Sequence, residues 1–110
     1  MTLEARDDGA LRVLVATGEL DAAVVPELLD TLPSLVAGAA GVALDLTSVT
    51  FFDSSGVRLV DRLTRTCARA STGFVVVAPR AGLPWRVLDL VGFGGQAVED
   101  VAAARARLLG

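Results

Sequence analysis

The chain has 110 residues, of which 53% are hydrophobic and 21% are charged, and its net charge is −3. This is the size of one domain, with enough apolar residues to fill a core, so a disordered chain is excluded. The absence of histidine and lysine and the presence of one cysteine exclude an imidazole base, a Schiff base, an internal disulfide and a cysteine-based zinc site.

The first third of the chain predicts a hairpin followed by a helix. An edge strand is expected at 2–6, joined through the turn "DDGA" to a strand over 11–20 that is apolar on both faces. Gly18 should close this second strand. The leucines of "AVVPELLDTLPSLVAG" (23–38) recur at helical spacing, and Pro33 should kink or split that helix near Thr31.

The rest of the chain alternates strands and helices. The expected elements are a strand at 41–46, a loop at 47–53, a helix over 56–70, a strand at 73–79, a helix from Pro84, a short strand within 94–98 and a helix within 99–110. This alternation predicts an α/β fold in a single domain, residues 1–110. Its sheet should be mixed, mostly parallel and four to five strands wide, with about four flanking helices.

One segment, "TSVTFFDSSGVRL" (47–59), places an acid, two serines and a glycine where a strand gives way to a helix. Functional groups gather at such points in open parallel sheets. The plainer interpretation is a helix N-cap, because Asp and Ser are favoured caps. A cap accounts for one of Asp53, Ser54 and Ser55, but not for three such residues in a row before Gly56.

Three segments in chain order connect this motif with a known family. "GELD" (18–21), "LDLTSVTFFDSSGVRLV" (44–60) and "VVVAPRAGLPWRVLDLVGF" (75–93) together resemble the STAS domain of bacterial anti-sigma factor antagonists. The likeness covers nearly the whole chain, and its specific part is the DSSG segment. It implies one STAS domain over 1–110, a mixed sheet flanked by helices, in agreement with the predicted element order.

The resemblance also implies a function. Ser55 matches the second serine of the family motif, which is the phosphoacceptor. The kinase would be an ATP-binding anti-sigma factor; the unphosphorylated antagonist binds it and frees a sigma factor, and a metal-dependent serine phosphatase resets the switch. Asp21 of "GELD" and the loop of Asp53, Ser54, Ser55 and Gly56 would face the partner. We therefore expect a binding module and not an enzyme.

Some features around the motif have two interpretations or depart from the family. Arg58, Arg62, Arg65 and Arg69 follow the motif at helical spacing. They form either a solvated face, with Asp61 paired to Arg65, or a surface on which Arg58, with or without Arg62, contacts an acidic partner. After "GELD", many relatives carry a Thr that could cap the first helix, whereas "AAVV" offers no side-chain oxygen, which should weaken that helix start.

The composition also bears on partners and location. The acidic balance, with one Trp, four Phe and no Tyr, is unlike a nucleic-acid-binding surface. No apolar run approaches the ~18 residues of a membrane span, and the charged first residues do not form a secretory signal. We expect a cytoplasmic protein without a metal or other cofactor. Trp85 should be half-buried, and Cys67 should be inert in the core.

Two alternatives remain open at this point. A STAS subunit of another assembly, such as a stressosome scaffold or an accessory subunit of a lipid-transporting ABC system, would share the fold and part of the motif. An enzyme could use Ser55 as nucleophile and Asp53 as base, but a carboxylate is a poor base for a serine and the sequence offers no third group to orient it.

Overall fold

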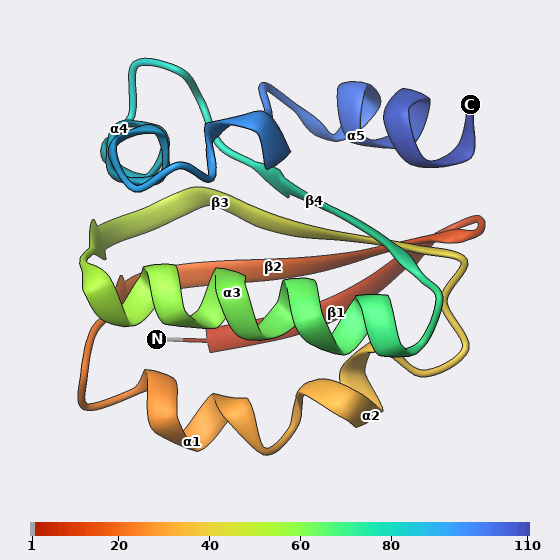
Figure 1. Ribbon diagram of the computed structural model, residues 1–110, viewed down its shortest axis with the longest axis horizontal. Coiled ribbons are helices and arrows are strands. Elements are labelled where there is room, and N and C mark those ends of the chain that lie inside the picture. The colour runs from red at the N-terminus through yellow and green to blue at the C-terminus, as the bar shows by residue number, and fades with distance from the viewer. Residues whose placement is uncertain (1) are drawn as a thin grey trace.

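The computed structural model describes residues 2–110, which form one five-stranded mixed sheet (Figure 1). The strands lie in chain order across the sheet, β1-β2-β3-β4-β5, and only β1 and β2 are antiparallel to each other. Their bounds are β1 Thr2–Asp8, β2 Leu11–Leu20, β3 Gly41–Phe52, β4 Gly73–Val77 and β5 Ala97–Val98. The predicted α/β class and the mostly parallel sheet are therefore confirmed.

The helices number five in residues 2–110, together with one short 3-10 helix, η1. Their bounds are α1 Val25–Leu29, α2 Leu32–Val36, α3 Ser54–Arg69, α4 Leu83–Leu90, η1 Gly94–Gln96 and α5 Val101–Leu109. The structure has one helix more than the four predicted, because the expected helix over 23–38 is split into two between Leu29 and Leu32. The break lies where Pro33 led us to expect it, since proline cannot donate the backbone hydrogen bond that a continuous helix requires.

The core lies on both faces of the sheet, because the central strands are apolar on both sides. Leu14 and Leu44 point to one face, where they pack with Leu63 of α3 and with α1, α2 and α4. Val13 and Ala43, one residue earlier on each strand, point to the other face and pack beneath α5. Figure 1 shows α1, α2 and α3 on one side of the sheet and α5 on the opposite side.

The strand ends differ from the sequence expectation at the edge that carries the motif. β3 does not end at residue 46 but continues through the expected loop to Phe52, because it pairs in parallel with β2 as far as Leu20 and Phe52. Likewise Gly18, with a φ of 89°, does not close β2 but lies next to an irregularity in the register. Thr47 and Ser48 are exposed in this part of β3, unlike the buried residues of Gly41–Leu44 before them.

No helix in residues 2–110 has both the length and the apolar character needed to cross a membrane. The same residues contain no group of three or more His, Cys, Asp or Glu side chains placed to hold a metal ion.

Candidate functional site

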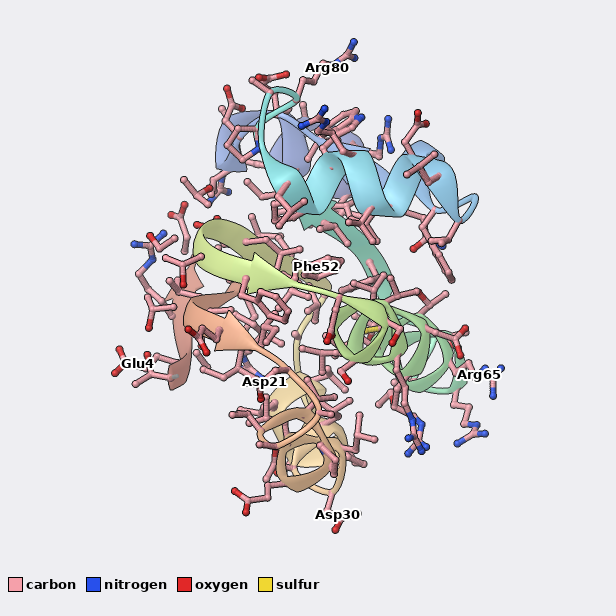
Figure 2. All side chains as sticks on the ribbon, turned by 90° about the vertical axis from the view of Figure 1, so that its left-hand side faces the viewer. Glu4, Asp21, Asp30, Phe52, Arg65 and Arg80 are labelled. Atoms are coloured by element: carbon pink, nitrogen blue, oxygen red, sulfur yellow. The ribbon has the colours of Figure 1, made fainter. Side chains whose placement is uncertain are left out.

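The candidate site lies at the edge of the sheet where β2 and β3 end. Because Leu20 pairs with Phe52 in a parallel register, the next residues, Asp21 and Asp53, follow neighbouring strands at the same edge. Figure 2 looks onto this edge and labels Asp21 and Phe52. The pairing of the two strands thus brings together the "GELD" and DSSG segments, which are 32 residues apart from Asp21 to Asp53 in the sequence.

Asp53 is the N-cap of α3. Its Oδ1 accepts a hydrogen bond from the backbone N–H of Ser55 at 2.8 Å, and its backbone carbonyl accepts one from Val57 at 3.1 Å. The plainer interpretation of the motif is therefore right for the acid. It does not extend to the serines, because the cap uses the backbone N–H of Ser55 and not its hydroxyl. Ser54 is exposed and Ser55 is half-buried.

Gly56 is buried beneath an aromatic ring. A Cβ built on Gly56 would lie 2.5 Å from Cε1 and 2.6 Å from Cδ1 of Phe52, whose side chain is only 3% exposed. Such contacts are far inside the ordinary carbon–carbon separation of about 3.5–4.0 Å. Gly56 is therefore required because it leaves room for the ring of Phe52 to pack against the first turn of α3.

Asp21 accepts backbone hydrogen bonds at the start of α1, as Asp53 does at the start of α3. As the "AAVV" segment led us to expect, the N-cap residue Val24 makes no side-chain hydrogen bond of its own. Instead, Oδ1 of Asp21 accepts hydrogen bonds from the backbone N–H groups of Ala23 at 3.0 Å and Val24 at 3.2 Å. The carboxylate of Asp21 thus supplies the capping oxygen that the side chains of "AAVV" lack.

A shallow open hollow of about 490 Å³ lies between the two aspartates. It is lined by Glu19, Asp21, Ala22, Ala23, Phe51 and Asp53. Three of these residues are acidic, and Phe51 is 43% exposed. Neither Glu19 nor the exposed ring carries a sequence signal of its own that points to the site. Their placement follows from the register, in which Glu19 pairs with Phe51 one residue before the strands end.

The arginine stripe lies on the outer side of α3. Arg65 forms the expected ion pair with Asp61 at 3.1 Å. Arg58 is exposed in the second turn of the helix, close in sequence to the serines, and Arg62 is partly exposed one turn further. Neither Arg58 nor Arg62 forms an ion pair within residues 2–110.

The two remaining candidate residues have structural roles. Cys67 is fully buried, and burial raises the pKa of its thiol to about 11, so it is an unreactive core residue. Trp85 is half-buried on α4, as expected, and the guanidinium of Arg80 lies 4.9 Å from the centre of its ring. Neither residue lines the hollow.

Similar folds occur among solved structures. An anti-sigma factor antagonist from Mycobacterium paratuberculosis is 24% identical, with a TM-score of 0.83 over 99% of this chain and 94% of that chain. The Bacillus cell fate determinant SpoIIAA in its phosphorylated form is 20% identical, with a TM-score of 0.72 over 96% and 98%. A sulfate transporter family protein from Wolinella succinogenes is 15% identical, with a TM-score of 0.70 over 91% and 85%.

Comparison with curated proteins finds no match. A family model described as "Mlab, STAS domain" matches residues 3–106, which is nearly the whole chain. The matched range includes both Asp21 and the DSSG segment, and the likeness to the solved structures agrees with it in fold. The chain therefore belongs to the STAS domain family.

Proposed function

We propose that this protein is an anti-sigma factor antagonist whose binding is switched off by phosphorylation of Ser55. The observation that carries the proposal is that Asp53, and not a serine hydroxyl, caps the start of α3. Asp53 provides the helix cap through the backbone N–H of Ser55, so the hydroxyl of Ser55 is left for other chemistry. The similar folds of a mycobacterial antagonist and of phosphorylated SpoIIAA support the same interpretation.

In the proposed cycle, the unphosphorylated protein binds an ATP-binding anti-sigma factor kinase and frees a sigma factor. The contact surface is made by Asp21, Asp53, Ser54, Ser55 and Arg58, with Gly56 beneath it. The kinase transfers the γ-phosphoryl group of ATP to the Oγ of Ser55; the hydroxyl proton is released and ADP leaves. A metal-dependent serine phosphatase then hydrolyses the phosphoserine with water. Because sigma factors act there, the proposal places the protein in the cytoplasm.

The electrostatics of this edge favour a switch that leaves the fold intact. A phosphoserine adds about −1.5 to −2 charges at neutral pH. At a helix N-terminus a negative charge gains about 0.3–1 kcal/mol, which Asp53 next to it partly offsets. In an interface, however, an unpaired buried dianion costs several kcal/mol. A cost of about 4 kcal/mol already lowers affinity roughly a thousandfold.

The same geometry argues for a binding module rather than an enzyme. An enzyme with Ser55 as nucleophile would need Asp53 as its base, but within residues 2–110 the carboxylate of Asp53 accepts the backbone N–H of Ser55 at 2.8 Å and makes no hydrogen bond with its hydroxyl. The carboxylate therefore serves the helix cap.

The proposal can be tested by isothermal titration calorimetry against a candidate anti-sigma factor kinase from the same genome. Ser55→Ala removes one hydroxyl, so it should lose no more than about 0.5–1.5 kcal/mol of binding free energy and should resist inactivation by ATP. Ser55→Asp should lose most of the binding. Ser54→Ala is the matched control for the switch: it removes a hydroxyl from the same surface but keeps Ser55, so ATP should still inactivate it. Equal affinities of the Ser55→Ala and Ser55→Asp variants would place residue 55 outside the interface.

A second candidate is a STAS subunit of another assembly, such as a stressosome scaffold or an accessory subunit of a lipid-transporting ABC system. The description of the matching family names Mlab and not an antagonist, and one similar fold comes from a sulfate transporter family protein. Phosphate mapping by mass spectrometry separates the candidates. Absence of phosphate on Ser55 with every encoded anti-sigma factor kinase would favour this second function, and phosphate on Ser54 alone would overturn the assignment of the acceptor.

A further inference from the structure

Arg58 lies on α3 three residues after Ser55. Residues at this spacing are neighbours on one side of a helix, with their Cβ atoms about 5–6 Å apart. Helical side chains also lean toward the N-terminus of the helix, so a long side chain at position 58 of α3 can reach the turn that holds Ser55. Arg58 is exposed and Ser55 is half-buried, so the guanidinium is free to approach the serine from the solvent side.

The acidic groups that could hold Arg58 elsewhere on α3 are already engaged. Asp61, three residues further along, forms its ion pair with Arg65 at 3.1 Å. Asp53, at the start of the helix, accepts the backbone N–H of Ser55. Within the range 2–110, the ion pairs involve Arg12, Arg65, Arg80 and Arg105 and leave Arg58 without a partner.

We infer that phosphorylated Ser55 forms an ion pair with Arg58, and that the modification thereby withdraws this arginine from the partner-facing edge. The inference rests on the proposed phosphorylation of Ser55. A guanidinium presents a planar fork of N–H donors that matches phosphate oxygens. The order along the helix, acid first and base one turn later, is the favoured one for such pairs.

The switch would then act on two charges at once. Phosphorylation adds negative charge at Ser55, and it also neutralises the nearest cation on the same side of α3. A partner that contacts Arg58 through an acidic group would lose that attraction in addition to meeting the phosphate. Arg62, seven residues after Ser55, lies about 10 Å along the helix and is beyond this pairing distance.

The test uses the full chain with phosphoserine incorporated genetically at position 55, so that no kinase is needed. A titration followed by ³¹P NMR gives the pKa of the phosphate in three proteins: the otherwise unaltered chain, Arg58→Gln and Arg69→Gln. If the ion pair forms, Arg58 should lower the pKa of the phosphate by about 0.2–0.7, the effect of an exposed ion pair. Arg58→Gln should therefore raise it by that amount.

Arg69→Gln is the matched control. Arg69 is an exposed arginine of the same stripe, but it is fourteen residues from Ser55, about 21 Å along the helix and beyond the screening length of about 8 Å at physiological salt. This variant should keep the pKa of the unaltered chain. The melting temperatures of the unphosphorylated variants should equal that of the unaltered protein, which shows that any shift comes from the lost pair.

Equal phosphate pKa values with and without Arg58 would overturn the inference, as would an Arg69→Gln shift as large as that of Arg58→Gln. Both results would leave the kinase-dependent switch intact. Conversely, a kinase that does not modify Ser55 would refute the proposed function, while the ion pair would still be measured on the incorporated phosphoserine.

Discussion

Replacing Gly56 by alanine would show whether this glycine is needed for packing. Gly56 lies in the first turn of α3 and does not have the positive φ that would itself demand glycine. Its added Cβ would lie 2.5 Å from Cε1 of Phe52. The ring is 3% exposed and is held in the main core, so it cannot move aside into solvent.

Two effects of opposite sign decide the outcome. At an open helical position, alanine in place of glycine stabilises a protein by about 1 kcal/mol. Overpacking a core costs typically about 1–3 kcal/mol. Because the contact would be about 1 Å inside the optimal separation of about 3.5 Å, we expect overpacking to dominate. The upper part of the overpacking range, about 2–3 kcal/mol, less the helix gain of about 1 kcal/mol, leaves a net loss of about 1–2 kcal/mol. The melting temperature should fall by about 4–8 °C for each kcal/mol.

Urea unfolding followed by circular dichroism measures this loss. In a Phe52→Leu background the ring is absent, so Gly56→Ala should cost much less than it does beside the ring, and the double-mutant cycle gives the coupling energy. Gly95→Ala is the control, because a Cβ there would meet no atom within 4 Å. A Gly56→Ala protein as stable as the unaltered one, or an unchanged cost in the Phe52→Leu background, would refute the packing argument.

Three further predictions follow from single contacts. Asp21→Ala removes the acceptor of two backbone N–H groups at the start of α1. Urea unfolding should show a loss of about 0.5–2 kcal/mol in the free energy of unfolding, which Asp21→Asn largely avoids. Equal losses in the two variants would contradict the capping role, and the affinity of both variants for the partner should be measured so that a loss of the cap is separated from a loss of contact. Burial raises the pKa of the Cys67 thiol to about 11, so a thiol reagent at pH 8 should modify Cys67 only after unfolding; rapid modification of the folded protein would contradict this. The hydrogen bond from Arg12 lowers the pKa of Asp7, so its stabilisation is present above the unfolded pKa and is lost as the pH falls through the lowered one. Asp7→Asn should reduce the acid sensitivity of the urea midpoint, and an unchanged pH profile would count against the pair.

Local sequence patterns determined the fold class and most of the elements. The runs at Leu11–Leu20 and Gly73–Val77 are apolar on both faces, which is what strands buried on both sides require. The helical spacing of leucines predicted the helices, and Pro33 located the break between α1 and α2. The acid and serines at Asp53–Ser55 marked the start of α3 to within two residues, because capping depends only on neighbours in the chain.

Tertiary structure alone decided how the candidate site is assembled. Residues 47–52 lie in the expected loop, although the Thr, Val and Phe among them favour strands; it is the pairing with β2 that extends β3 to Phe52. That register places Asp21 beside Asp53, leaves Phe51 exposed at the hollow and sets the ring of Phe52 over Gly56. Strand pairing joins Asp21 to Asp53 across 32 residues of the sequence, and the contact of Phe52 with Gly56 depends on where that pairing ends β3, so no local period or cap encodes either.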